Sequence, residues 1–114
     1  MKQKEREKLY QKFSGCCAYC GDRLQKGWHA DHIEPMRRYR DGTIENPEND
    51  TMDNLNPSCP SCNRLKNSFS IEEFRNNIQN YVNSLNKYSV QYKVAKKYGL
   101  VEETNKKVTF RFEE

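Results

Sequence analysis

Two cysteine pairs constrain this 114-residue chain more than any other feature. Cys17 with Cys20 and Cys59 with Cys62 both have the Cys-x-x-Cys spacing. Four thiolates in two such pairs match the number and spacing of ligands in a closed tetrahedral zinc site. Gly21 follows the first pair and can adopt a positive φ, which lets backbone amides turn toward sulfur. We therefore expect these four cysteines to hold a structural zinc, with dithiol redox chemistry as the alternative.

Composition explains why such a chain needs a metal. Only 34% of the residues are hydrophobic, so a chain of this length can bury only a small apolar core. The charged N-terminus leads into no apolar segment, and no later run is long enough to cross a bilayer, so we expect a cytoplasmic protein without a signal peptide. Thiols stay reduced there, which favours metal binding over disulfides. Cys16 is expected to be a free thiol, although it could replace Cys17 as a ligand.

The positions of the basic residues are more informative than the formal net charge, which is only +4. They fall into three groups: Arg37, Arg38 and Arg40; Arg64 and Lys66; and Lys87, Lys93, Lys96 and Lys97. Such groups are typical of surfaces that bind polyanions, but also of ordinary solvated faces.

The pattern of apolar residues predicts four helices and two strands. The predicted elements are a helix over residues 5–13, a strand over 28–33, a long loop over 36–53, a helix from residue 63, a helix opening at Ser70, another over about 89–98, and a strand over 107–112. Ser70 and Glu73 form a capping box. We expect the two C-terminal helices to bury apolar stripes, which are Ile71, Phe74, Ile78, Val82 and Leu85 in the first and Val90, Val94 and Tyr98 in the second.

The adjacent residues Asp31 and His32 carry the chemistry of a hydrolytic site. A carboxylate is a hard ligand for a divalent cation, and an imidazole can take a proton from water near neutral pH. A zinc that joins the two cysteine pairs would also draw Asn54 and Asn63 toward these residues. His29 shares the predicted strand face of Asp31, where an exposed polar role is the simpler interpretation.

Three motifs follow one another along the chain: Cys-x-x-Cys-Gly, Ala-Asp-His-Ile-x-Pro and Asn-Leu-x-Pro-x-Cys-x-x-Cys-Asn-x-x-Lys. Together they resemble the zinc-bearing HNH endonucleases, particularly small phage and prophage versions, over Cys17 to Lys66. The resemblance implies an α+β fold with a ββα-metal, treble-clef-like zinc unit. We expect one domain over residues 1–114, with a core at 17–67, a helical extension at 70–98 and a final strand at 107–112.

The resemblance also assigns roles to individual residues. It implies that Asp31 and Asn63 bind a catalytic cation, that His32 is the general base, and that Asn54 orients this base through its backbone. Many members have His in place of Asn63, and often in place of Asn67. Amide oxygen instead of imidazole shifts the expected catalytic cation toward Mg²⁺ or Mn²⁺. Asn67 is expected to be a solvated amide, or to hold a metal-bound water.

The substrate implied by the resemblance is DNA, with RNA and branched DNA left open. Flanking phosphates would be held by five basic residues: Arg37, Arg38, Arg40, Arg64 and Lys66. The expected location is the cytoplasm of a bacterium or of a phage-infected host cell. Two alternatives remain, a zinc-stabilised module that binds DNA or a protein without catalysis, such as a phage packaging accessory, and a purely structural treble-clef domain.

Overall fold

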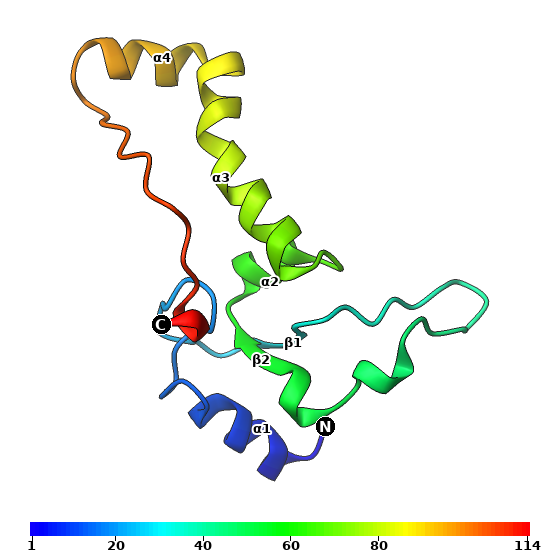
Figure 1. Cartoon of the computed structure of the whole chain (residues 1–114). Coiled ribbons are helices and arrows are strands. Elements are labelled where there is room, and N and C mark those ends of the chain that lie inside the picture. Colours follow the sequence, from blue (N-terminus) through cyan, green and yellow to red (C-terminus); the bar gives the residue numbers. More distant parts are fainter.

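The computed structural model describes residues 1–114 and has an α+β architecture (Figure 1). Its elements are α1 (Gln3–Gln11), β1 (His29–His32), β2 (Leu55–Ser58), α2 (Pro60–Lys66), α3 (Ile71–Tyr88) and α4 (Val90–Lys97), with 3-10 turns at Pro47–Asn49, Met52–Asn54 and Arg111–Glu113. No helix is both long and apolar enough to span a bilayer.

A two-stranded antiparallel sheet forms the centre of the molecule. β1 pairs with β2 in a register that sets Asp31 opposite Asn56 and His32 opposite Leu55. α2 begins two residues after β2, so the end of the sheet leads directly into a helix. Between the strands, residues 33–54 form the predicted long loop, which extends away from the body (Figure 1).

The hydrophobic core is small and largely aromatic. Its buried members are Cys17, Tyr19, Leu24, Phe74 and Phe110. The Phe74 and Phe110 rings stack with centroids 5.1 Å apart, and the Tyr19 ring packs edge-on against both. Such a core buries little apolar area, which fits the expectation that a metal site adds stability.

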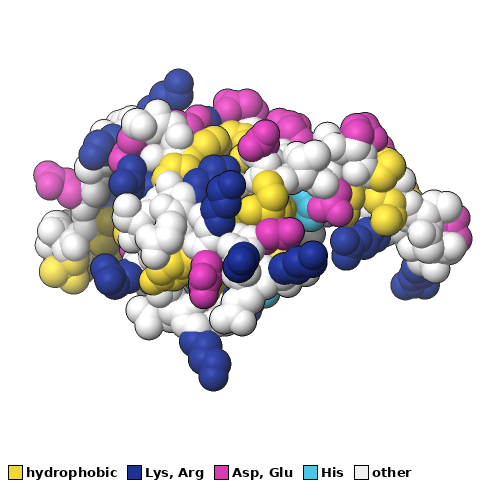
Figure 2. Space-filling model, turned by 90° about the horizontal axis from the view of Figure 1, so that it is seen from below, with side chains coloured by type: hydrophobic (Ala, Val, Ile, Leu, Met, Phe, Trp, Pro, Cys, Tyr) yellow, Lys and Arg dark blue, Asp and Glu magenta, His cyan; other side chains and the backbone are white.

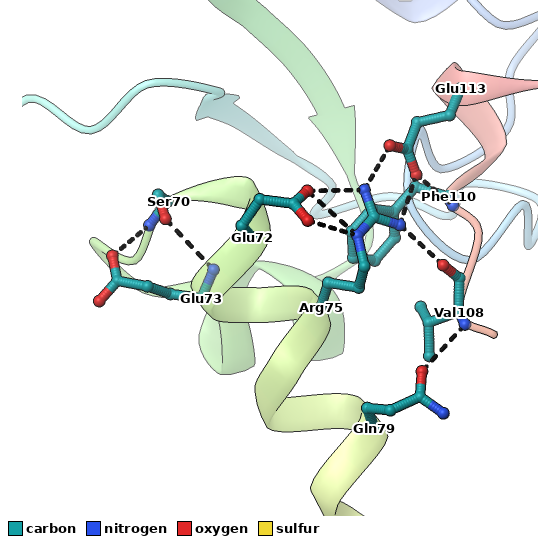
Figure 3. A network of polar contacts seen from close by, with 8 residues as sticks. All are labelled: Ser70, Glu72, Glu73, Arg75, Gln79, Val108, Phe110 and Glu113. Atoms are coloured by element: carbon teal, nitrogen blue, oxygen red, sulfur yellow. Dashed lines mark hydrogen bonds and ion pairs between the residues drawn. The ribbon is translucent and has the colours of Figure 1, made fainter.

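Arg75 of α3 fixes the C-terminal segment to the core (Figure 3). Its guanidinium bonds the carboxylates of Glu72 and Glu113 and donates to the carbonyl of Val108 at 2.7 Å. One turn further along α3, Gln79 accepts a hydrogen bond from the Val108 amide at 3.0 Å. The segment after α4 therefore returns to the body as an extended strap.

The predicted strand over residues 107–112 is wrong. This segment has no strand pairing, and its end forms the 3-10 turn at Arg111–Glu113. The alternation correctly turns Phe110 inward, but the segment packs on α3 and meets no sheet edge. Its last amides bond carbonyls of the first cysteine loop, with Phe112 donating to Ala18 at 2.8 Å.

The predicted burial of the second half of the helical extension is also wrong. Its apolar residues Val82, Leu85, Val90, Val94 and Tyr98 are exposed. The end of α3 and all of α4 project from the body as an arm, defined here as residues 81–98 (Figure 1). The radius of gyration is 16.9 Å, against about 13 Å for a compact chain of this length. The stripe is exposed because no other element packs against it.

The helix ends, in contrast, follow the local sequence signals. The Ser70 and Glu73 capping box opens α3, and the Ser89 hydroxyl accepts from the third amide of α4. Gly99 has φ 74° just after α4, the left-handed conformation expected there.

Candidate functional site

The four predicted zinc ligands form one cluster. The sulfur atoms of Cys17, Cys20, Cys59 and Cys62 all lie within 4.8 Å of one another. Four sulfurs about 2.3 Å from a tetrahedral zinc lie about 3.8 Å apart, and the Cys20 and Cys59 sulfurs are 3.8 Å apart. Cys16 lies outside the cluster, so Cys17, and not Cys16, is the candidate ligand that pairs with Cys20. The four-cysteine cluster thus suggests a structural zinc.

Backbone amides point at these sulfurs from both cysteine loops. The amides of Tyr19 and Cys59 each lie 3.4 Å from the Cys17 sulfur. Gly21 has φ 80°, the positive value expected after the first cysteine pair. The Cys62 thiol and these amides lower the pKa of Cys17, whereas burial raises the pKa of Cys20 and the hydrogen bond with Cys17 raises that of Cys62. Four neighbouring thiolates therefore need a cation to compensate their charge.

Asp31 lies next to this cluster and is almost fully buried at 5% exposure. Its Oδ2 atom accepts from the Tyr19 hydroxyl at 2.5 Å and faces the Lys66 ammonium at 3.1 Å. Burial raises the pKa of the Asp31 carboxyl, and the contacts with Lys66 and Tyr19 act in the opposite direction. No protein hydrogen bond occupies Oδ1, so this oxygen is available to a ligand.

Asp31 shares a hollow of about 160 Å³ with His32 and Asn63. β1 supplies the first two residues and α2 supplies the amide. Asn67 and Ser68 complete the polar part of the lining. Asn67 ends α2 with φ 51°, so it follows the helix instead of sharing a helical face with Asn63. The predicted acid, imidazole and metal-binding amide therefore meet at one place.

A comparison with protein-family models matches residues 17–69 to the family described as HNH endonuclease. The segment over residues 17–69 is therefore similar to an HNH domain. The match covers just under half of the chain, from the first cysteine pair to the turn after α2, and leaves out α1 and the arm. No curated protein and no solved structure matched the chain. HNH domains generally act on nucleic acids as endonucleases.

Within the HNH segment, Asn54 does not contact the His32 ring. Its carbonyl accepts from the Ile33 amide at 2.8 Å, and its side chain bonds both the amide and the carbonyl of Glu34. Asn54 thus braces the backbone directly after β1. Its carbonyl can therefore influence the orientation of His32 only through the peptide that joins His32 to Ile33.

Asp50 is the residue that contacts the imidazole, and no motif or spacing in the sequence points to it. Its Oδ1 lies 3.0 Å from Nε2 of His32. The hydrogen bond to His32 is the main cause of the lowered pKa of Asp50, so this carboxylate is ionised at neutral pH. Asp50 lies in an irregular loop between two 3-10 turns, where no periodicity or spacing rule applies.

The five predicted phosphate contacts divide into two classes. Arg37, Arg38, Arg40 and Arg64 are exposed, three of them on the long loop and one on α2. Lys66 has 0% exposure and donates to the His32 carbonyl at 2.7 Å in addition to its contact with Asp31. Its predicted phosphate contact is wrong, because an ammonium without solvent access cannot meet a phosphate of the substrate.

Proposed function

We propose that this protein is a metal-dependent endonuclease that hydrolyses phosphodiester bonds in DNA. The observation that carries the proposal is the convergence of Asp31, His32 and Asn63 on one hollow inside the HNH segment. A carboxylate and an amide can bind a divalent cation and an imidazole can act as a general base, which together suffice for cation-assisted hydrolysis of a phosphodiester.

The donor set of the hollow suits a hard divalent cation. Oδ1 of Asp31 makes no hydrogen bond, and the Asn63 side chain has no protein partner, so both can offer an oxygen. Mg²⁺ and Mn²⁺ prefer oxygen donors, whereas zinc fits the four sulfurs nearby. When bound, such a cation would offset charge on the scissile phosphate and on the leaving oxygen.

His32 is the proposed general base. Because the Asp50 carboxylate only accepts hydrogen bonds, the proton of the neutral imidazole lies on Nε2. Nδ1 then carries the lone pair that takes a proton from the attacking water. The exposed arginines of the loop and Arg64 would hold phosphates next to the scissile one without reading sequence.

The chain offers a matched control for testing His32. Its two histidines, His29 and His32, lie on the same strand, but His29 is exposed and does not line the hollow. We expect His32→Ala to reduce cleavage of supercoiled plasmid in Mg²⁺ or Mn²⁺ by about 10²–10⁴-fold. His29→Ala should cleave like the wild type, and both variants should keep their zinc and melting temperature.

Equal cleavage by His32→Ala and the wild type would remove His32 from the mechanism. A wild type that binds DNA but cuts neither plasmid nor single-stranded RNA in either metal would contradict the proposed nuclease activity. That outcome would support the non-catalytic zinc module instead. Preferential cleavage of RNA would keep the mechanism and change the substrate.

A further inference from the structure

The arm carries a charge that the rest of the protein lacks. Residues 81–98 contain four lysines and no Asp or Glu, which equals the whole formal net charge of +4. The remainder of the chain is therefore neutral overall, and four zinc-bound thiolates would make it negative by about two charges. On the face shown in Figure 2, opposite the arm in Figure 1, Lys and Arg are interspersed with Asp and Glu.

Three of the lysines surround one hollow. Lys93, Lys96 and Lys97 line it together with Asn86, and its volume is about 320 Å³. The Lys96 ammonium is paired with Glu103 at 2.7 Å. Lys93 and Lys97 have no ion pair, so two ammonium groups of the hollow lack a counter-charge. An anion with several oxygens, such as a backbone phosphate, fits this arrangement.

Exposed aromatic side chains lie beside the lysines. Tyr88, the last residue of α3, is 73% exposed, and Tyr98, directly after α4, is 79% exposed. The Lys87 ammonium lies 5.3 Å from the centroid of the Tyr88 ring. Lysines with neighbouring aromatic rings are a combination that binds backbone phosphates and, in single strands, also stacks on bases. A second copy of the chain is a poorer occupant, because it would bring two sets of unpaired lysines together.

We infer that the arm is a second nucleic-acid-binding site, which holds backbone phosphates of the substrate away from the cleavage hollow. The inference rests on the proposed function in one respect, since the ligand is taken to be the nucleic acid that is cut. The arm lies outside the HNH match, so this contact is not part of the family segment. The longest dimension of the molecule is 51 Å, and a duplex of about 30 base pairs, roughly 100 Å long, exceeds it.

The test compares two double variants with the same loss of charge. Lys93→Gln with Lys97→Gln alters the arm, and Lys2→Gln with Lys4→Gln alters the exposed N-terminus. Both are made in the His32→Ala background so that binding is measured without cleavage. Fluorescence anisotropy with a duplex of about 30 base pairs at several salt concentrations gives the slope of log K against log salt.

Each phosphate contact contributes about 0.9 to this slope, so we expect the arm variant to lower its magnitude by about 1.8 and the control to leave it unchanged. Equal slopes for both variants would overturn the inference. A change of molar mass in light scattering, with no change of slope, would also overturn it, because the arm would then join two copies.

Cleavage assays separate this result from the proposed function. If the slope depends on the arm but no form cuts DNA in either metal, the second binding site stands and the nuclease assignment fails. If the wild type cuts DNA and the slope does not depend on the arm, the nuclease assignment stands and the second binding site fails.

Discussion

Replacing Lys66 by methionine should destabilise the protein far more than the loss of a surface lysine. Methionine keeps most of the side-chain volume, so little of the effect comes from a cavity. The lysine has 0% exposure, and its ammonium lies 3.1 Å from Oδ2 of Asp31. Removal of the cation leaves the buried carboxylate without its charged partner, with only the Tyr19 hydroxyl bonded to it.

The magnitude follows from this geometry. Loss of one member of a buried ion pair costs about 3–5 kcal/mol, whereas a substitution on an exposed face costs about 0.5 kcal/mol or less. A small domain has a free energy of unfolding of about 5–15 kcal/mol, so a loss of about 3–5 kcal/mol in Lys66→Met would remove much of it. Asp31→Asn combined with Lys66→Met removes both charges and should cost less than the sum of the single substitutions.

Urea denaturation of the zinc-loaded protein measures these effects. The four forms are the wild type, Lys66→Met, Asp31→Asn and the double variant, and Arg64→Met on the exposed side of α2 is the control. We expect a loss of about 3–5 kcal/mol for Lys66→Met and a coupling of at least about 1 kcal/mol with Asp31→Asn. A loss near that of the control, or strictly additive effects, would refute the buried pair.

Two further predictions concern the metal and the C-terminal strap. Cys59→Ser should abolish cooperative thermal unfolding and zinc binding, while Cys16→Ser should leave both intact; a normal melting curve for zinc-free Cys59→Ser would contradict the structural role. The pKa of Glu113 is lowered chiefly by its hydrogen bonds with Arg75, so this pair stabilises the fold above about pH 4.3 and is lost as pH falls through the lowered folded pKa. Glu113→Gln should therefore flatten the acid decline of stability in urea titrations, unlike the exposed control Glu102→Gln, and parallel declines would argue against it.

The features that the sequence predicted depend on residues close together in the chain. Cys-x-x-Cys spacing fixes sulfur positions within one loop, and the capping box of Ser70 and Glu73 acts within one helical turn. The residues alone predicted β1 but not β2, which was implied only by the family resemblance. β2 contains Pro57, a residue that usually argues against a strand, but here its carbonyl accepts from Ala18 at 2.8 Å.

The features that were missed depend on what lies across space. The apolar stripe of α4 has the periodicity of a buried face, yet burial requires a second surface and the chain provides none. Lys66 belongs to a motif that suggests substrate contact, but α2 turns it inward onto Asp31. Asp50 reaches His32 from 18 residues away through an irregular loop. No rule based on local sequence predicts contacts between residues so far apart in the chain.

The zinc cluster and the candidate catalytic hollow are built from the same two short segments. Between Cys17 and Cys20 lies Tyr19, whose hydroxyl bonds Asp31. Immediately after Cys62 come Asn63 and then Lys66, which reach the hollow and the Asp31 carboxylate from the other side. A zinc held by the four cysteines would therefore also set the position of Asp31 without being a reactant. Loss of zinc should therefore abolish cleavage in step with the fold, whereas loss of His32 should abolish cleavage alone, and this difference separates the structural metal from the proposed chemistry.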